Sequence, residues 1–342
     1  MNIPVLSAAE LKQLLAMDEV IVGVETVYRL KAQGETDVWP HVCHRFTGEH
    51  EGVMDIKSGA IGGTVRLHGA KLLNTFWGNA ARNLPTFTGL LMLFDATTGL
   101  PLGIMDASYI TCMRTGASGA LGIKAFARAD ASRLFVMGAG KQAIFQIAAT
   151  LTLLPQFTTV IIGDPRSDEQ AERFAASLPH RLASEFNVQG LDGVAFRAAR
   201  QDTMADLVRG SDAIITITPA TQPLIPDEWV APGTHLSCVG ADMPGKEEVD
   251  PALFKRARVF ADDLEQCSRI GEMELPLAQG VISRDDVVGE IGDVLQGTIP
   301  GRVDSNDVTL FDATGLALLD LITAKQAIDR AAAARLGQQV EI

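Results

Sequence analysis

The chain has 342 residues, of which 47% are hydrophobic and 21% charged, a composition that fits two folded domains and excludes a disordered protein. It carries 42 acidic and 29 basic side chains, for a formal net charge of −13. We therefore expect no nucleic-acid partner, because a phosphate-binding surface needs a large excess of cations. A few buried cations can nevertheless form a local pocket for a small anion.

The four cysteines, Cys43, Cys112, Cys238 and Cys267, are far apart and form no CxxC pair. This spacing favours reduced thiols over a disulfide framework or a zinc site, and we expect no metal centre. The first residues lack the basic start and apolar core of a signal peptide. No apolar run approaches the roughly 18 residues that span a bilayer. We therefore expect a soluble cytoplasmic protein.

The first third of the chain is predicted to combine helices with a sheet. Ser7 and Glu10 have the spacing of a capping box ahead of an amphipathic helix, and a second helix is expected from Asp18 to about Gly34. Between residues 40 and 106, short apolar stretches alternate with Gly and Pro, which is typical of several strands. Asp106 is expected to cap a long helix that follows it.

From Ser132 onward the pattern alternates between strand and helix. Short apolar runs at 134–138, 159–164, 195–199, 213–218, 234–240 and 257–263 are separated by segments of helix length. This alternation predicts an α/β fold with a doubly wound parallel sheet. Residues 308–328 predict a strand and an apolar helix that packs back on the first domain or on a partner chain. We expect residues 295–306 to form the return crossing between the two domains.

The sharpest motif follows the first strand of that alternating region. The sequence GAGKQA, at 138–143, stands between a predicted strand and a predicted helix, which is the context of a dinucleotide-binding turn. Its glycines allow a tight turn and a close approach of the backbone to a pyrophosphate, whose charge the helix N-terminus would stabilise. We predict cofactor contacts from this turn by Gly138, Ala139, Gly140, Lys141 and Gln142.

Asp164 ends the second strand of the predicted fold. A carboxylate at this position can accept both ribose hydroxyl groups and repels a 2′-phosphate, so NAD is favoured over NADP. Arg166, two residues later, keeps NADP open as an alternative, and a simple turn before Pro165 would also explain the aspartate.

Three cations lie among apolar or turn residues: Arg45, Lys71 and Arg114. Each is either a solvated surface group or a buried group held by an anion. Asp242 follows an apolar strand and precedes a Pro-Gly turn, at the carboxyl end of a strand where open α/β sheets bind ligands. A turn or capping role would explain Asp242 equally well.

Several segments together give the chain a resemblance to a known family. They are Met54 after a strand, GAKLLN, LPTFTG, MRTGASGA, GAGKQA, CVGADMPGK, VFADDLEQ and VTLFDATGLALLDL, in this order. By these motifs the chain resembles the ornithine cyclodeaminase/mu-crystallin family over nearly its full length, and it looks closest to the archaeal-type alanine dehydrogenase branch. The resemblance implies a substrate-binding and dimerisation domain built from 1–118 and 312–342, around a Rossmann domain at 119–311.

The resemblance also implies roles for individual residues. Arg45, Lys71 and Arg114 match cations that hold the substrate α-carboxylate, and Thr86 matches a residue that lines the same pocket. Asp242 matches an aspartate that moves protons, a role that Lys71 would share. Cofactor contacts are implied for Arg114, Thr218, Val239, Lys246 and, by a looser alignment, Asn306.

The implied activity is NAD-dependent interconversion of an L-α-amino acid with its imine, or with a 2-oxo acid and ammonia. Ornithine cyclodeaminases carry an acid two residues before the motif methionine and a proline just after it, where this chain has Gly52 and Asp55. Glu51, one residue away, is a candidate replacement for that acid, which keeps cyclodeaminase as an alternative, beside a non-catalytic binding protein like mu-crystallin. Lys57 or His44 is hypothesised to meet a second carboxylate, which adds iminosuccinate, and hence aspartate, to alanine as candidates.

Overall fold

The computed structural model describes residues 1–48 and 50–342, and the chain divides into two compact units. Met1–Arg114 and Leu316–Ile342 form the first, here called the terminal unit, and Thr115–Gly315 form the second, the central unit. The sequence placed these boundaries at 118/119 and 311/312, whereas the contacts divide the chain at 114/115 and 315/316.

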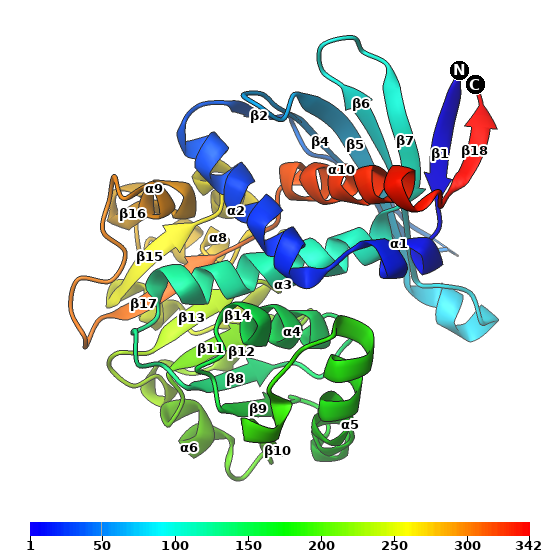
Figure 1. Ribbon diagram of the computed structural model, residues 1–342. Helices are drawn as coiled ribbons and strands as arrows, with labels where there is room; N and C mark the ends of the chain where they lie inside the picture. The colour runs from blue at the N-terminus through cyan, green and yellow to red at the C-terminus, as the bar shows by residue number, and fades with distance from the viewer. Residues whose placement is uncertain (49) are drawn as a thin grey trace. The chain divides into compact units, whose positions relative to one another are not determined.

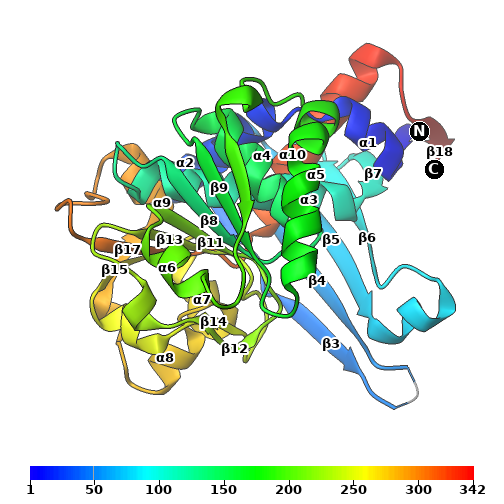
Figure 2. The same cartoon turned by 90° about the horizontal axis from the view of Figure 1, so that it is seen from below.

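The terminal unit is built on one mixed sheet, with the order β18-β1-β7-β6-β5-β4-β2 and with β3 paired to β4. All neighbouring strands are antiparallel except β1 and β7, which are parallel. Figure 2 shows β3 and β4 running side by side. The strands are β1 (Asn2–Leu6), β2 (Thr36–Val38), β3 (Val42–Phe46), β4 (Gly52–Ile61), β5 (Leu67–Phe76), β6 (Phe87–Asp95), β7 (Pro101–Asp106) and β18 (Gln338–Glu341). Met54 therefore lies within a strand rather than after one.

Three helices of this unit come from the two ends of the chain. The predicted capping box is present: Ser7 caps α1 (Ala8–Leu14) and Glu10 caps it in return. The second predicted helix is α2 (Met17–Ala32). The C-terminal helix α10 (Ala317–Ala334) packs on α2 and on β4, β5 and β6 (Figure 1), so its apolar side is covered by the terminal unit, as predicted.

Two glycines let α10 lie close to the sheet. A Cβ at Gly59 of β4 would come within 2.8 Å of Leu318 Cδ2, and one at Gly69 of β5 within 2.7 Å of Leu321 Cδ2. Both distances are too short for a side chain, so larger residues would push the helix away. The close approach matters because α10 carries an acidic side chain, Asp320, toward this face of the sheet.

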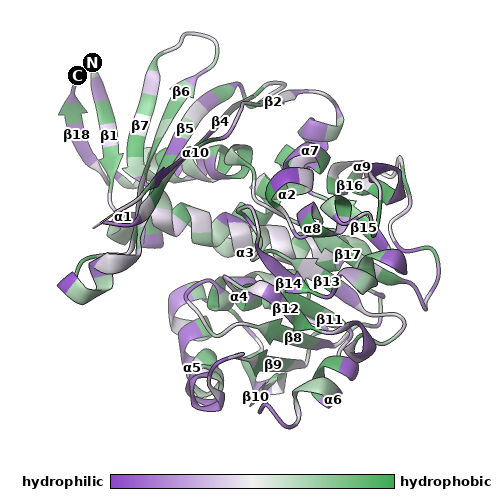
Figure 3. Cartoon of the chain, turned by 180° about the vertical axis from the view of Figure 1, so that it is seen from behind, coloured by the Kyte–Doolittle hydropathy of each residue, from purple (hydrophilic) through white to green (hydrophobic). Residues whose placement is uncertain are grey.

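The central unit contains a fully parallel eight-stranded sheet with the order β10-β9-β8-β11-β13-β17-β15-β16. This confirms the predicted doubly wound fold, whose strand order reverses between β8 and β11. Figure 3 shows hydrophobic colouring along its central strands, in agreement with the buried side chains of Phe135, Ile214 and Leu236. The strands are β8 (Arg133–Met137), β9 (Thr159–Gly163), β10 (Ala195–Ala198), β11 (Ala213–Thr216), β13 (His235–Cys238), β15 (Ala257–Ala261), β16 (Val287–Glu290) and β17 (Val308–Asp312).

The remaining elements connect these strands. A small parallel pair, β12 (Thr221–Ile225) and β14 (Glu247–Val249), stands apart from the large sheet. The longer connecting helices are α3 (Ala107–Phe126), which leads from one unit into the other, α4 (Ala143–Leu153) and α5 (Asp168–Phe186). Shorter ones are α6 (Met204–Arg209), α7 (Leu264–Ile270), α8 (Glu274–Ala278) and α9 (Ile291–Gln296).

The prediction that residues 295–306 cross between the units is wrong. These residues lie inside the central unit and lead from α9 to β17. β17 is an interior strand, hydrogen-bonded to β13 on one side and to β15 on the other. The chain therefore has to complete this strand before it leaves the central unit, after Gly315.

Candidate active site

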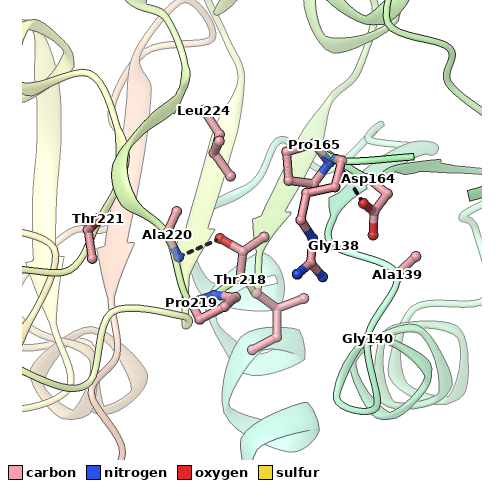
Figure 4. Close-up of a pocket in the computed structure, with 12 residues that line it drawn as sticks. Gly138, Ala139, Gly140, Asp164, Pro165, Thr218, Pro219, Ala220, Thr221 and Leu224 are labelled. Atoms are coloured by element: carbon pink, nitrogen blue, oxygen red, sulfur yellow. Dashed lines mark hydrogen bonds between the residues drawn. The ribbon is translucent and has the colours of Figure 1, made fainter. Parts of the chain in front are cut away.

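The first candidate site is a crevice at the carboxyl edge of the central sheet. A cavity of about 440 Å³ lies there, lined by residues that follow β8, β9 and β11 (Figure 4). The lining residues used below are Gly138, Ala139, Gly140, Asp164, Arg166 and Thr218. The strand order reverses between β8 and β11, and open α/β sheets bind nucleotides at such a reversal.

Gly138 forms the tight turn that the sequence predicted. Its φ is +122°, a value that favours glycine, and its N–H donates to the Gly163 carbonyl at 2.7 Å. A Cβ at this position would lie 2.8 Å from the Ile217 carbonyl oxygen. The Gln170 side chain also donates to the Ala139 carbonyl at 3.2 Å, which ties α5 to the turn. Hydrogen bonds thus hold the turn from β9 and from α5, and a Cβ at Gly140 would have no described atom within 4 Å, which leaves room for a phosphate beside this residue.

Asp164 stands at the end of β9 and lines the same cavity, with only 4% of its surface exposed. Its Oδ1 accepts a hydrogen bond from the Arg166 N–H at 3.0 Å, and its carbonyl accepts one from Gln201 Nε2 at 2.9 Å. The carboxylate therefore has a fixed position with further acceptor capacity, as recognition of ribose hydroxyl groups requires. The glycine turn and this carboxylate fit a bound dinucleotide.

The other residues expected at the cofactor fall into two groups. Thr218 lines the cavity, and Val239 follows β13 at the same carboxyl edge of the sheet. Lys141 and Gln142 directly precede α4, and Lys141 is exposed. Asn306 does not fit: it precedes β17, and its carbonyl accepts from Gly233, which precedes β13. Asn306 is thus at the amino edge of the sheet, opposite the crevice, and we remove it from the predicted contacts.

Asp242 and Lys246 form an ion pair in the loop after β13. Lys246 Nζ lies 2.5 Å from Asp242 Oδ1 and 3.3 Å from the Gly240 carbonyl oxygen. About half of the Asp242 side chain is exposed, so it can still contact a ligand. Lys246, for which the family resemblance implies a cofactor contact, therefore holds Asp242, for which it implies a role in proton transfer.

The second candidate site is a buried polar cluster in the terminal unit. Lys71, in β5, donates to Asp320 Oδ2 at 2.7 Å and to Thr111 Oγ1 at 3.3 Å. Arg114 and Thr111 lie three residues apart in α3, and both donate to Asp320 Oδ1 at 3.2 Å. The structure therefore brings two of the three predicted cations together around one carboxylate from α10.

Burial governs the charges of this cluster. Lys71 is 1% exposed, and burial lowers its pKa to about 7, with Arg114 and Lys57 adding to the effect and Asp320 opposing it. Burial alone raises the pKa of Asp320, but Arg114 and Lys71 outweigh it and lower that pKa below its ordinary value. Asp320 therefore remains ionised at neutral pH, whereas Lys71 exchanges a proton in that range.

Lys57 extends the cluster along the sheet. It is directly opposite Lys71 in the pairing of β4 with β5, on the same face, and it is 8% exposed. His44 pairs with Met54, whose position in β4 places both on the other face. The hypothesis that His44 meets a second carboxylate is therefore wrong, and that hypothesis now rests on Lys57 alone.

Arg45 shares the face of Lys57 and Lys71 but stands further along the sheet. It pairs with Val53, four residues from Lys57 in β4, and its guanidinium carbon lies 6.0 Å from the centre of the Trp77 ring. Arg45 is exposed, as is Thr86, whose carbonyl accepts from the Phe76 N–H at 2.9 Å. The structure thus does not bring Arg45 and Thr86 into the buried cluster.

Glu51 lines a separate cavity of about 350 Å³ with Phe76 and Arg82, among others. Neither Lys71 nor Arg114 lines that cavity. Asp55, where the cyclodeaminases have proline, is engaged by His41 at 2.8 Å.

Asp320 is the residue that sequence reasoning missed. It is 0% exposed and is the acceptor shared by Lys71, Arg114 and Thr111. A signal was available, because Asp320 interrupts the apolar run GLALLDLITA. Aspartate is almost never fully buried unless it is paired, so its position in an apolar helix points to a cationic partner.

Two features are absent from the part of the chain that the structure describes. Among these residues, no three His, Cys, Asp or Glu side chains are arranged to hold a metal ion. None of the helices in this part combines the length and apolar character required to cross a membrane.

Comparisons with known proteins place this geometry in a family. The model of the ornithine cyclodeaminase/mu-crystallin family matches residues 1–335. The alanine dehydrogenase of Archaeoglobus fulgidus is 33% identical over 337 residues, which are 98% of either chain.

Three solved structures cover essentially the whole fold. An archaeal alanine dehydrogenase dimer with bound NAD has a TM-score of 0.90 at 32% identity, and it covers 100% of both chains. The iminosuccinate reductase of Paracoccus denitrificans, in complex with NAD⁺, has a TM-score of 0.90 at 31% identity and the same coverage. The Δ1-pyrroline-2-carboxylate reductase of Thermococcus litoralis, with NADH and L-proline, has a TM-score of 0.89 at 26% identity and covers 99% of this chain and 100% of that one.

Proposed function

The chain belongs to the ornithine cyclodeaminase/mu-crystallin family, and from this premise we propose that it is an NAD-dependent oxidoreductase of α-amino acids. It interconverts a small L-α-amino acid with its imine, or with a 2-oxo acid plus ammonia. The observation that carries the proposal is the buried cluster in which two cations, Lys71 and Arg114, share the buried carboxylate of Asp320. Such an excess of buried cations favours an anionic ligand.

The substrate α-carboxylate is the anion that we assign to this cluster. Arg114 offers a planar guanidinium, whose Nε–H is engaged by Asp320, and Lys71 adds a compact charge beside it. Binding a carboxylate here supplies negative charge where burial otherwise destabilises two cations. Arg45 and Thr86 retain, within this proposal, the substrate-binding roles that the family resemblance implies, and both lie outside the buried cluster.

The proton chemistry is assigned to Lys71 and Asp242. Oxidation of the amino acid removes a hydride from its α-carbon and a proton from its nitrogen, and NAD, when bound, accepts the hydride at C4. Lys71, with a pKa of about 7, can take up that proton as a neutral amine and return it as an ammonium. Asp242, held by Lys246, is proposed to receive a proton from water or from the substrate nitrogen.

NAD is the proposed cofactor rather than NADP. The buried carboxylate of Asp164 lines the cavity beside the Gly138 turn, where it can accept ribose hydroxyl groups and repels a 2′-phosphate. The similar structures of alanine dehydrogenase and iminosuccinate reductase contain NAD or NAD⁺, which supports the same choice.

Substrates with a second carboxylate form a candidate class beside alanine. Lys57 is buried and stands directly opposite Lys71, so it adds positive charge next to the proposed α-carboxylate position. This favours iminosuccinate, with aspartate as the product, over a basic amino acid. Cyclodeamination of ornithine needs an acid for the distal ammonium, and Glu51 lines a separate cavity.

A panel assay tests the proposed function. Pyruvate, oxaloacetate, glyoxylate and cyclic imines are supplied with ammonium and either NADH or NADPH, and ornithine and lysine are tested for ammonia release. We expect NADH oxidation with pyruvate or oxaloacetate. Ammonia release from ornithine without a net change in NADH would instead establish a cyclodeaminase. Tight NADH binding without turnover of any substrate would establish a binding protein.

We also propose that two copies of the chain associate through the sheet of the terminal unit. The face of β6 opposite Lys71 carries Leu90 and Met92, which are 59% and 41% exposed. The register places Leu72 of β5 and Ile104 of β7 beside them on that face. An exposed apolar patch of this kind is typical of a protein interface, and the similar archaeal alanine dehydrogenase is a dimer. Light scattering is expected to give twice the chain mass, and a Leu90→Glu/Met92→Glu double variant is expected to give a monomer.

A cytoplasmic location completes the proposal. Cys43, Cys112, Cys238 and Cys267 are not joined in disulfides, and three of them are buried. Cysteines that stay reduced are typical of a reducing compartment, and NAD-dependent amino-acid chemistry is consistent with that location. Fractionation of cells that express the chain tests this assignment.

A further inference from the structure

Among the buried acidic side chains of the central unit that the proposed reaction does not use, three are linked through one series of backbone hydrogen bonds. Glu248 and Asp312 are 0% exposed and Glu272 is 1% exposed. Glu248 lies in β14, Asp312 ends β17, and Glu272 lies between α7 and α8. We call these residues the carboxyl cluster. Buried acids without a cationic partner are uncommon, because burial strongly disfavours the ionised form.

The carboxyl cluster connects loops at the carboxyl edge of the sheet. Glu248 Oε1 accepts from the Thr218 N–H at 2.6 Å, and its Oε2 accepts from the Gly240 N–H at 3.0 Å. Thr218 follows β11 and Gly240 follows β13, so one carboxyl group holds the ends of two neighbouring strands. Thr218 also lines the cavity that we assign to the dinucleotide.

The other two acids support Glu248 from behind. Glu272 Oε1 accepts from the N–H groups of Glu248 and Val249, at 2.6 and 2.7 Å. Asp312 Oδ2 accepts from the Met273 N–H at 2.9 Å, which fixes the segment that carries Glu272. The hydrogen bonds thus run in series from the end of β17 to the wall of the cavity.

Two glycines are fitted to these carboxyl groups. A Cβ at Gly240 would lie 2.5 Å from the Thr218 carbonyl oxygen and would collide with Glu248 Oε2. A Cβ at Gly271 would lie within 2.5 Å of Asp312 Oδ2. The carboxyl groups of Glu248 and Asp312 therefore fit only because residues 240 and 271 are glycines without a side chain. This close fit indicates that both carboxyl groups have defined positions.

Protons compensate the charge of the carboxyl cluster. Glu272 Oε2 and Asp312 Oδ1 are buried and accept no hydrogen bond. Burial raises the pKa of Glu248 to about 7 and that of Asp312 to about 8, and burial together with Glu248 raises that of Glu272. Among the described residues, the further titratable groups with the largest effects on the cluster include Cys238, Asp262 and Cys267, which carry no positive charge.

We propose that Glu248 is a positioning residue of the dinucleotide site, which holds the Thr218 and Gly240 loops in their binding arrangement while Glu272 and Asp312 keep a proton within the carboxyl cluster. This inference rests on the proposed function, because it assigns a cofactor to the cavity that Thr218 lines. Loss of the proton places like charges side by side without solvent, and their repulsion loosens the loops. Cofactor affinity should therefore fall as the pH rises through the range from 7 to 8.

The test measures NADH binding by fluorescence titration in the absence of any substrate. Glu248→Gln keeps the shape of the side chain, but it turns an amide NH₂ toward one of the two N–H donors that the carboxylate accepts. We expect the Kd for NADH to rise at least tenfold, with kcat at saturating NADH changed less than threefold. Glu247→Gln, in the same strand but on its other face, is the matched control and is expected to bind NADH like the unmodified protein.

The pH profile separates positioning from a general loss of stability. Asp312→Asn cannot ionise, so its NADH affinity is expected to fall less between pH 6.5 and 8.5 than that of the unmodified protein. If Glu248→Gln does not fold, Gly240→Ala displaces the same carboxyl group and is expected to weaken NADH binding.

Either of two results overturns the proposal. The first is an unchanged NADH affinity in the folded Glu248→Gln variant, or in Gly240→Ala where that variant replaces it. The second is a pH profile of NADH affinity in Asp312→Asn that is the same as in the unmodified protein. The failure of the proposed function would look different. It would appear in the unmodified protein, either as no binding of NADH or as NADH binding without oxidation in the substrate panel, and neither result depends on Glu248.

Discussion

The two units contain buried polar clusters that compensate their charge in opposite ways. In the terminal unit, Lys71 and Arg114 share the ionised carboxylate of Asp320, so opposite charges are paired. In the central unit, the carboxyl cluster of Glu248, Glu272 and Asp312 contains acids alone, and protons take the place of cations. The first arrangement leaves an excess of positive charge for an anionic ligand, whereas the second leaves an almost neutral support for backbone N–H groups.

This difference gives the two clusters opposite pH responses. Lys71 has a folded-state pKa of about 7, below its ordinary value of 10.5, so between these values the folded chain binds fewer protons than the unfolded chain, and its contribution to stability rises with pH. Glu248 and Asp312 have raised pKa values, of about 7 and about 8. Their contribution is complete below the ordinary carboxyl pKa values and is lost as the pH rises through the raised ones.

The largest expected effect is the loss of catalysis on substitution of Lys71. Lys71→Met keeps an unbranched side chain of similar length but removes the charge and the exchangeable proton. We expect kcat/KM for the amino acid to fall by about 10²–10⁴-fold, the usual contribution of a positioned proton-transfer group. The remaining pH profile should lack the inflection near pH 7 that we expect in the unmodified protein. Lys325→Met, on α10 and paired with Asp329, is the control. Activity within threefold of the unmodified protein would remove Lys71 from the mechanism.

Asp320→Asn tests whether counter-charge is what maintains the terminal cluster. The substitution leaves Lys71 and Arg114 buried without their shared anion, which typically costs about 3–5 kcal/mol of the free energy of unfolding. Urea denaturation at pH 7 measures the change. Asp329→Asn, on the exposed side of the same helix, is the matched control and should change the free energy by no more than about 0.5 kcal/mol. If Asp320→Asn and Asp329→Asn lowered the free energy of unfolding equally, the buried ion pairs of Asp320 would not stabilise the terminal unit more than an exposed ion pair does.

Asp312→Asn tests protonation as the compensation in the central cluster. In the unmodified protein, Asp312 makes the free energy of unfolding fall as the pH rises from about 5 to about 8, by at most about 1.4 kcal/mol per pH unit. The asparagine variant cannot ionise, so this part of the slope should vanish. Urea denaturation at several pH values measures it, with Asp202→Asn as an exposed control. A slope that steepens in Asp312→Asn would contradict the assignment.

Local patterns explain what could be predicted from the sequence. The Gly138 turn, the strands around it and the capping box of Ser7 and Glu10 depend on neighbouring residues, and all are present. The apolar character of α10 likewise indicated that this helix is covered, because an apolar helix is unstable in water.

Long-range pairing explains what could not be predicted. The Lys71–Asp320 contact joins residues 249 positions apart, and no local pattern encodes it. The hypothesis that His44 meets a second carboxylate failed because the strand register, which the sequence does not specify, decides on which face of the sheet the side chain lies. The cofactor contact predicted for Asn306 failed for a similar reason. Asn306 precedes β17 and therefore lies at the amino edge of the parallel sheet, which the motif alone does not show.

The smallest expected effect is that of Asp164, at the edge of the cofactor cavity. Its carboxylate is proposed to act on the bound dinucleotide, not on other buried charges. Asp164→Ser removes the repulsion of a 2′-phosphate while it keeps a hydroxyl group for the ribose. We expect the preference for NADH over NADPH, measured as the ratio of kcat/KM values, to fall by about tenfold, which corresponds to about 1.4 kcal/mol. Lys71→Met should leave the ratio of the two cofactor dissociation constants unchanged, because the terminal cluster acts on the substrate. The proposal would be contradicted if Lys71→Met changed the ratio of the NADH and NADPH dissociation constants while Asp164→Ser left the kcat/KM preference for NADH unchanged. The terminal unit would then act on the cofactor and the central unit would not select it.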